Sequence, residues 1–216
     1  MFNFLKINNP VIAFLEKVCN LMIANVLFVL CSLPIVTIGA SMTALCKTMQ
    51  DYVPGSSEDN GIVKRFFTTF AQNFKQATAA WLLVMLFLTG LGYNLFLVAA
   101  NSQGASWIVC VLLLILLVMG IGIASYVFAL LARYENTLKE HYRNSLILLI
   151  GNLPRSLLLV GINTLVFWMP YFSVELFLRS FIAWLMIGFS LVCYGDMIVL
   201  RPIFQQLEKQ AQSQGQ

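Results

Sequence analysis

Long runs without a charged side chain dominate the chain, and they predict membrane-spanning helices. The longest run extends from Gln76 to Ala132, between the flanking charges of Lys75 and Arg133. A helix needs about 20 apolar residues to cross the hydrocarbon core of a bilayer. This run therefore predicts two spans joined by a short turn, and it predicts an integral membrane protein.

Further charge-free runs extend the prediction to about five spans. They cover residues 18–46, 156–174 and 180–195. Pro34 and Gly39 interrupt the first run, so we expect a helix to end there and a short interfacial helix to begin near Gly39. The predicted fold is an all-α, multi-pass membrane protein with one domain at residues 1–204 and a flexible polar tail at 205–216. The five predicted spans are residues 15–37, 77–100, 106–131, 155–173 and 177–200.

The composition of the chain supports a membrane protein and argues against a soluble or nucleic-acid-binding one. The chain is 60% hydrophobic and 10% charged, whereas soluble domains carry about 25% charged residues. The net charge of +4 is spread thinly, so we expect no nucleic-acid partner. The five cysteines form no CxxC pair, which favours buried free thiols over disulfides or a metal site.

No combination of residues predicts catalysis. The chain lacks the phosphate-binding loop, the zinc-protease helix and the nucleophile elbow. Its single histidine, His141, has basic neighbours and is expected on the surface rather than in an active site. We therefore expect no enzymatic activity, no catalytic residue, no bound metal and no cofactor.

Basic residues in the connections predict the side on which each span ends. They gather in residues 47–75, in residues 133–155 and near the C-terminus, whereas the turn between spans two and three has none. Arg179 is the single basic residue at the turn from span four to span five, next to the start of the charge-free run 180–195. This distribution places the N-terminus outside and the C-terminus in the cytoplasm, although Lys6 and Lys17 oppose that assignment.

The segment from Gly61 to Gln76 predicts an amphipathic helix on the cytoplasmic side. Aromatic residues recur four apart on one face, and basic and polar residues fill the other, as in helices that lie among lipid headgroups. This helix could simply lead into span two, could dock a partner, or could bind a ligand. The candidate partner-contact residues of this segment and the next connection are Lys64, Arg65, Phe66, Phe70, Phe74, Lys75, Arg133, Arg143 and Arg155.

The two cytoplasmic connections have similar plans. Each follows a span, contains an interfacial helix and ends at a polar corner, at residues 73–75 in one case and 152–155 in the other. The chain could therefore consist of two related units of span, interfacial helix and span, followed by a fifth span.

Four polar residues are predicted inside spans: Asn25, Asn94, Asn163 and Asp196. The asparagines could form hydrogen bonds between helices, or together they could line a polar pathway. Intramembrane carboxylates are costly and often functional, so Asp196 could form a structural ion pair or could carry protons or substrate. The arginines considered as its ion-pair partners are Arg133, Arg155 and Arg201.

Several motifs resemble those of the YesL-like family of integral membrane proteins from Gram-positive bacteria, over roughly residues 1–205. The residues that carry the resemblance are Asn25, Leu33-Pro34-Ile35-Val36-Thr37-Ile38-Gly39-Ala40, Phe66, Phe70, Asn73-Phe74-Lys75-Gln76-Ala77-Thr78, Leu131-Ala132-Arg133-Tyr134-Glu135-Asn136 and Asn152-Leu153-Pro154-Arg155.

The resemblance implies a location and a biological setting. Members are multi-pass proteins of the bacterial plasma membrane, often encoded beside carbohydrate importers of the ATP-binding cassette (ABC) type and beside glycan-degrading enzymes. It implies an accessory subunit that binds, stabilises or regulates such an importer, with its permease subunits and the lipid bilayer as partners. The ATPase-docking loop of an importer permease is absent here. A self-sufficient small-solute transporter and a membrane assembly factor are the alternative hypotheses.

Overall fold

The described part of the protein is all-helical, as the sequence predicts. The structure, a computed structural model, describes residues 10–53, 61–100, 107–172 and 174–214. In chain order the elements are α1 (Pro10–Cys31), the 3-10 turn η1 (Ile35–Thr37), α2 (Ile38–Tyr52), α3 (Ile62–Ala100), α4 (Trp107–Leu131), α5 (Leu138–Gly151), α6 (Leu153–Phe172), α7 (Val174–Ala183), the π-helical segment η2 (Trp184–Gly188) and α8 (Phe189–Gln214).

Within the described chain, 4 segments are long and apolar enough to cross a membrane, and a bent helix pair raises the number to 5. The four are Phe14–Cys31, Ile62–Val98, Trp107–Leu131 and Phe181–Gln210. The bent pair is α5 with the first part of α6. The prediction of a multi-pass protein with about five spans is therefore confirmed by helix length and hydropathy.

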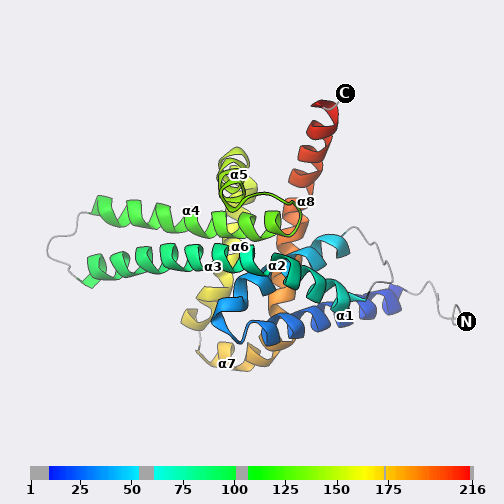
Figure 1. Cartoon of the computed structure of the whole chain (residues 1–216). Coiled ribbons are helices and arrows are strands. Elements are labelled where there is room, and N and C mark those ends of the chain that lie inside the picture. The colour runs from blue at the N-terminus through cyan, green and yellow to red at the C-terminus, as the bar shows by residue number, and fades with distance from the viewer. Residues whose placement is uncertain (1–9, 54–60, 101–106, 173, 215–216) are drawn as a thin grey trace, which may run out of the picture.

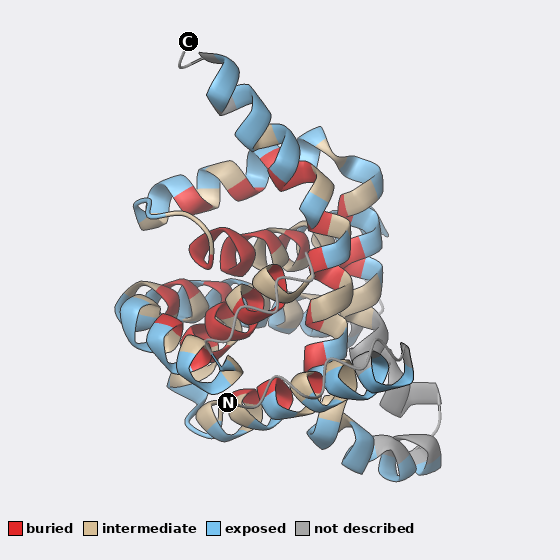
Figure 2. Cartoon of the chain, turned by 90° about the vertical axis from the view of Figure 1, so that its right-hand side faces the viewer, coloured by how far each residue is buried: buried red, intermediate tan, exposed pale blue. Residues whose placement is uncertain are grey.

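The helices form two groups that cross each other (Figure 1). The long helices α3 and α4 form an antiparallel hairpin whose outer end extends away from the rest of the protein. Helices α1 and α2 lie beside the inner part of this hairpin, whereas α6 and α8 run crosswise to it. Buried residues gather in the middle of the protein, and the last turns of α8 project outward and are exposed (Figure 2).

The break predicted after the first span is confirmed. Helix α1 ends at Cys31, and α2 begins after the short turn η1. The hydroxyl of Thr37 donates hydrogen bonds to the carbonyl oxygens of Cys31 (2.6 Å) and Pro34 (2.7 Å), which stabilise the reversal. The chain then returns alongside α1. A hydrogen bond shows this: Asn20 Nδ2, in the middle of α1, donates to the hydroxyl of Tyr52 at the end of α2 (3.4 Å). The first turns of α1 and the end of α2 therefore lie on the same side.

The prediction that α2 is an interfacial helix is wrong, because α2 is a central element. It packs against α1, α3, α4 and α8. A helix on the membrane surface would instead leave one face among the headgroups. The buried residues of α2 are Gly39, Ala40, Ser41, Thr43, Ala44, Leu45, Cys46, Thr48, Met49 and Gln50.

Polar side chains make the sequence of α2 look like a surface helix, but most of them are satisfied inside the fold. The hydroxyls of Ser41, Thr43 and Thr48 donate to the carbonyl oxygens four residues earlier, at 3.0, 3.0 and 2.8 Å. A hydroxyl bonded in this way can be buried among apolar helices. Gln50 Nε2 donates to the carbonyl of Ala129 in α4 (2.8 Å). These internal bonds allow α2 to lie in the core.

Helix α3 joins the predicted amphipathic helix and span two without a break. It runs continuously from Ile62 to Ala100, so the predicted corner at residues 73–75 lies inside a helix. The corner at residues 152–155 differs, because α5 and α6 meet there at 108°. The two connections, which look alike in sequence, therefore have different geometry.

The aromatic stripe of α3 packs inward at its first turns. Phe66 is 0% exposed and belongs to the core, so it is not available to a partner in this structure. The rings of Phe66 and Phe70 stack with their centres 6.4 Å apart, and the rings of Phe70 and Phe74 lie 5.6 Å apart. Phe67 and Phe74 are exposed. The stripe is therefore divided, because Phe66 contacts the core whereas Phe67 and Phe74 remain on the surface.

The expected position of His141 is wrong. His141 is buried rather than on the surface, with 1% of its area exposed. The backbone of Asn136 lies nearby, but neither ring nitrogen of His141 has a hydrogen bond of good geometry with the described residues. Residues 205–214 continue α8 as a mostly exposed helix, and the flexibility expected of this polar tail stays a prediction.

All five cysteines are free. Cys46 of α2 and Cys193 of α8 are buried, with their sulfur atoms 3.7 Å apart. Cys31 and Cys110 are partly exposed, and Cys19 is exposed. The expectation of buried free thiols is therefore confirmed for two of the cysteines.

Candidate functional site: a polar groove at the helix ends

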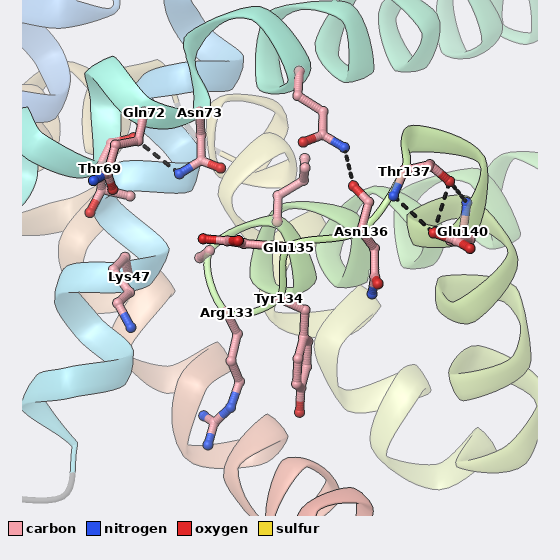
Figure 3. Close-up of a pocket in the computed structure, with 13 residues that line it drawn as sticks. Lys47, Thr69, Gln72, Asn73, Arg133, Tyr134, Glu135, Asn136, Thr137 and Glu140 are labelled. Atoms are coloured by element: carbon pink, nitrogen blue, oxygen red, sulfur yellow. Dashed lines mark hydrogen bonds between the residues drawn. The ribbon is translucent and has the colours of Figure 1, made fainter.

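A polar groove lies where α2, α3 and the connection from α4 to α5 converge. Its volume is about 660 Å³. Two segments that the sequence singled out separately, residues 73–78 and 131–136, both contribute to it. The lining residues are Lys47, Thr69, Gln72, Asn73, Gln76, Leu131, Ala132, Arg133, Tyr134, Glu135, Asn136, Thr137 and Glu140 (Figure 3).

One wall of the groove is the polar face of α3. Thr69, Gln72, Asn73 and Gln76 follow one another at helical spacing on this face. Asn73 Nδ2 donates to the carbonyl of Thr69 (3.2 Å). Gln76 Nε2 reaches across and donates to the carbonyl of Asn136 (2.6 Å), which ties α3 to the opposite wall.

The opposite wall is the connection between α4 and α5, which ends in a capping box. The hydroxyl of Thr137 accepts from the backbone N–H of Glu140 (3.4 Å), and the Glu140 carboxylate accepts from the backbone N–H of Thr137 (2.9 Å). This reciprocal pair satisfies two donors at the start of α5. The connection is thereby held in a defined shape.

Arg133 and Tyr134 anchor the connection to α8. Arg133 donates two hydrogen bonds to Oε1 of Glu208, at 3.1 and 2.6 Å. Its guanidinium lies 5.0 Å from the ring centre of Phe204, and the Tyr134 ring centre lies 6.2 Å from the same ring. Burial raises the pKa of Tyr134 despite the nearby Arg133, so its hydroxyl stays protonated at neutral pH.

Charged residues of both signs line or border the groove. Lys47 lies 3.4 Å from Asp51, and Arg65 lies 3.7 Å from the same carboxylate. Glu135 is exposed and has no ion pair or hydrogen bond with the residues that the structure describes. Glu135 therefore has no bonding partner in the described structure, whereas Lys47 and Arg65 are both paired with Asp51.

The predicted partner-contact residues lie in several places. Arg133 lines the groove, Arg65 borders it through Asp51, and Phe66 is in the core. The structure brings only part of the predicted set together. The others are exposed (Lys64, Phe74, Lys75 and Arg143) or partly buried (Phe70 and Arg155).

The amides that shape the groove are not among the predicted partner-contact residues. In the sequence, Gln72 and Asn73 belong to a polar helix face, and Gln76 and Asn136 belong to the motifs that carry the family resemblance. The signal that could have found them is the concentration of amides and hydroxyls on one face of residues 69–76, directly before the long charge-free run.

The predicted intramembrane polar residues do not form one pathway in the described structure. Asn25 bonds to the π-helical segment and to the helix after it. Its Nδ2 donates to the carbonyls of Trp184 (3.1 Å) and Leu185 (2.7 Å), and its Oδ1 accepts from the N–H of Ser190 (2.8 Å). A π segment displaces backbone groups from the regular helical pattern. Asn25 satisfies three backbone groups there and joins α1 to α8.

Asp196 bonds to an asparagine rather than to an arginine. Asn163 Nδ2 donates to Oδ2 of Asp196 (2.9 Å), which joins α6 to α8. The other carboxylate oxygen of Asp196 is buried without a hydrogen bond from the described residues. Within the described ranges, the arginines considered as its partners, Arg133, Arg155 and Arg201, form no ion pair with it.

Asn94 lies apart from this group. It is exposed on the outer part of α3, and its Nδ2 donates to the carbonyl of Gly90, four residues earlier (2.8 Å). No metal site accompanies these polar residues: in the part of the chain that the structure describes, no group of three or more His, Cys, Asp or Glu side chains could hold an ion.

Comparison with known families gives a match to part of the chain. Residues 21–95 match the family described as "Protein of unknown function, DUF624". This range includes the second half of α1, all of α2 and most of α3, and it contains the α3 wall of the groove. No curated protein and no solved structure matches the chain.

Proposed function

We propose that this protein is a non-enzymatic accessory subunit of a carbohydrate ABC importer, and that it binds the importer's permease subunits in the plasma membrane. The observation that carries the proposal is the groove, which joins residues 73–78 and 131–136 in one surface at the helix ends. Both segments carry the resemblance to the YesL-like family. An accessory subunit needs a contact surface of this kind, because its role is to recognise a partner protein rather than to move a solute.

The intramembrane polar groups favour a scaffold over a transporter. Asn25 and the pair formed by Asn163 and Asp196 are bonded across helix contacts that hold α8 to α1 and α6. Polar groups used in this way stabilise helix packing. A transport pathway would need them to face a shared polar cavity.

We further propose that the groove and the first turns of α1 face the cytoplasm. Because α2 returns alongside α1, the start of α1 lies on the same side as the end of α2. Lys17 would then join the basic residues of the groove side, and Arg179 would be the exception among the described lysines and arginines. This arrangement satisfies the positive-inside rule better than the topology predicted from the sequence, which placed the N-terminus outside. Reporter fusions at both termini test it, and an N-terminal reporter active only outside the cell would refute it.

Co-purification tests the proposed partner. The tagged full-length protein, extracted from its native host in mild detergent, should carry permease subunits of a sugar importer in a constant ratio. Gln72→Trp should block the groove and remove the permease, because Gln72 is an exposed lining residue. Gln205→Trp, at an exposed position of α8 outside the groove, is the matched control and should retain the permease.

Recovery of the protein without permease subunits, in repeated preparations, would contradict the proposal. Deletion of the gene for this protein distinguishes two possible roles, assembly of the importer and regulation of its activity. A lower amount of importer with an unchanged transport rate per complex would identify an assembly factor. An unchanged amount of importer with a changed rate would identify a regulator.

Asp196 is the observation that favours a second function, transport of a small solute. One of its carboxylate oxygens is buried without a hydrogen bond from the described residues, and such groups often mark proton or ion pathways. Protein reconstituted in vesicles should then move a solute, and Asp196→Asn should abolish the movement while the protein remains folded. Unchanged flux in that variant would remove Asp196 from the mechanism.

A further inference from the structure

Two amide side chains of α3 offer their oxygens as acceptors in the groove. Asn73 Nδ2 donates to the carbonyl of Thr69, and Gln76 Nε2 donates to the carbonyl of Asn136. These bonds set the orientation of each amide, because a flipped amide would place its oxygen against a carbonyl oxygen. The oxygen of each side chain therefore stays available for a donor from outside.

The carboxylate of Glu135 lies in the same groove. Figure 3 shows Asn73 and Glu135 extending into one space from opposite walls, Asn73 from α3 and Glu135 from the connection after α4. Glu135 forms no ion pair or hydrogen bond within the described structure. Together with the two amide oxygens, it makes a set of hydrogen-bond acceptors that includes one full negative charge.

The other charged residues of the groove are already bonded. Lys47 lies 3.4 Å from Asp51, and Arg133 lies 2.6 Å from Glu208. The carboxylate of Glu140 is held in the capping box at the start of α5. Among the charged lining residues, Glu135 is therefore the one without a bonding partner in the described structure, and the chemistry that complements its carboxylate is cationic and rich in N–H donors.

We propose that the groove receives an arginine side chain from a cytoplasmic segment of the partner protein. A guanidinium carries five N–H donors in a planar fork and no acceptor. It can form a bidentate pair with the Glu135 carboxylate and direct its remaining N–H groups at the amide oxygens of Asn73 and Gln76. A volume of about 660 Å³ accommodates the side chain together with part of the segment that carries it. This inference rests on the proposed function, since it names the chemistry of the partner's contact.

Peptide binding to the full-length protein tests the arginine contact directly. The probes are three fluorescent pentapeptides that share alanine at the outer positions and carry arginine, lysine or citrulline at the centre. The protein is held in an uncharged maltoside detergent, so that no lipid headgroup competes. The arginine peptide should bind saturably, and the citrulline peptide, which has nearly the same shape without the charge, should bind about tenfold more weakly or less. The lysine peptide should fall between them, because an ammonium cannot form the bidentate pair.

Two matched variants locate the binding. Glu135→Gln keeps the shape of the side chain and removes the charge, so it should lower the affinity for the arginine peptide about tenfold and leave the citrulline peptide unchanged. Glu175→Gln changes an exposed acid on α7, outside the groove, and should have no effect. Both variants should elute as the parent protein does in size-exclusion chromatography.

Three results would overturn the inference: no saturable binding of the arginine peptide, equal binding of the arginine and citrulline peptides, or an unchanged affinity in Glu135→Gln. These results are separable from those of the co-purification. Arginine binding without a co-purified permease would remove the proposed function but keep the site. A co-purified permease without arginine binding would place the contact elsewhere on the protein.

Discussion

The inner and outer halves of the α3–α4 hairpin are similarly apolar in sequence but differ in their surroundings. The inner half, residues 77–84 and 119–131, includes much of the core, among it Ala77, Ala80 and Tyr126. In the outer half, residues 85–100 and 107–118, no side chain that the structure describes is buried. The inner half is enclosed by α1, α2, α5 and α6, whereas we expect lipid to cover the outer half.

The difference shows what hydropathy measures in a membrane protein. Lipid chains and a protein core are both apolar, so large hydrophobic side chains suit either one. Close packing between helices requires small side chains instead. Gly39 of α2 meets Ala77 of α3 at such a point: a Cβ on Gly39 would overlap the carbonyl oxygen of Ala77 and the Cβ of Trp81. Tight contacts at small residues, rather than hydropathy, therefore distinguish the inner half, because a Cβ at Gly90 in the outer half would meet nothing within 4 Å.

The largest effect is expected from Gly39→Ala. The overlap falls on backbone atoms, so α2 and α3 must move apart, and we expect a loss of about 2 kcal/mol or more in stability. Gly90→Ala is the matched control in the outer half, because a Cβ there meets nothing within 4 Å. It should be neutral or stabilise the helix by up to about 1 kcal/mol. Thermal denaturation in detergent, followed by size-exclusion of a fluorescent fusion, measures both.

A similar loss for the two glycine variants would mean that the inner contact is not tight. In that case the contrast between the halves would rest on burial alone.

A smaller effect is expected from truncating a leucine of α4. Leu130 is 3% exposed and Leu112 is 55% exposed on the same helix. Leu130→Ala should cost about 2 kcal/mol, the low end for a buried leucine, since it leaves a cavity that the neighbouring helices only partly fill. Leu112→Ala should cost little, because lipid or detergent takes the place of the lost atoms. Equal losses, measured by the same thermal assay, would show that the outer half is packed against protein after all.

The sequence predicts the spans and the break at Pro34, because both depend on local properties of the chain. Charge-free length indicates a helix that can cross a bilayer, and Pro34 disfavours a continuous helix because it lacks a backbone N–H and crowds the preceding turn. The position of α2 could not be predicted in the same way. Its polarity resembles that of a surface helix, and only the hydrogen bonds inside the fold show why Thr43 and Gln50 can be buried.

The groove likewise could not be predicted from local properties of the chain. The sequence identifies residues 73–78 and 131–136 as separate motifs, but their meeting depends on how α3 packs against the end of α4. His141 is a further example, because its basic neighbours in sequence suggest a solvated side chain, whereas α5 turns it inward. Burial of a residue on an amphipathic helix depends on which face the fold covers.

Two asparagines allow the same comparison for polar residues, and we expect a stability loss of intermediate size. They are Asn25 and Asn94. Asn25 is buried and bonds to three backbone groups of η2 and α8, whereas Asn94 is exposed and bonds to its own helix. Asn25→Leu should cost about 1–2 kcal/mol, because it removes a hydrogen-bond partner from each of those backbone groups in an apolar environment. Asn94→Leu should be neutral or slightly stabilising, and the same thermal assay measures both variants. A larger loss for Asn94→Leu would indicate that Asn94 has a partner outside this chain.

The smallest effect is expected from the ion pair that follows the inner end of α4. Arg133 and Glu208 are partly exposed, with side chains 28% and 47% accessible, and pairs of this kind contribute about 0.5 kcal/mol. A double-mutant cycle of Arg133→Gln and Glu208→Gln should give a coupling energy of that size, reduced further by salt. The pair Arg179 and Glu175 is 77% and 73% accessible and provides the exposed reference, with a coupling energy near zero. If the Arg133 pair couples no more strongly than this reference, the ion pair does not hold the connection that carries Glu135, and the packing of Tyr134 against Phe204 would be the contact that anchors it.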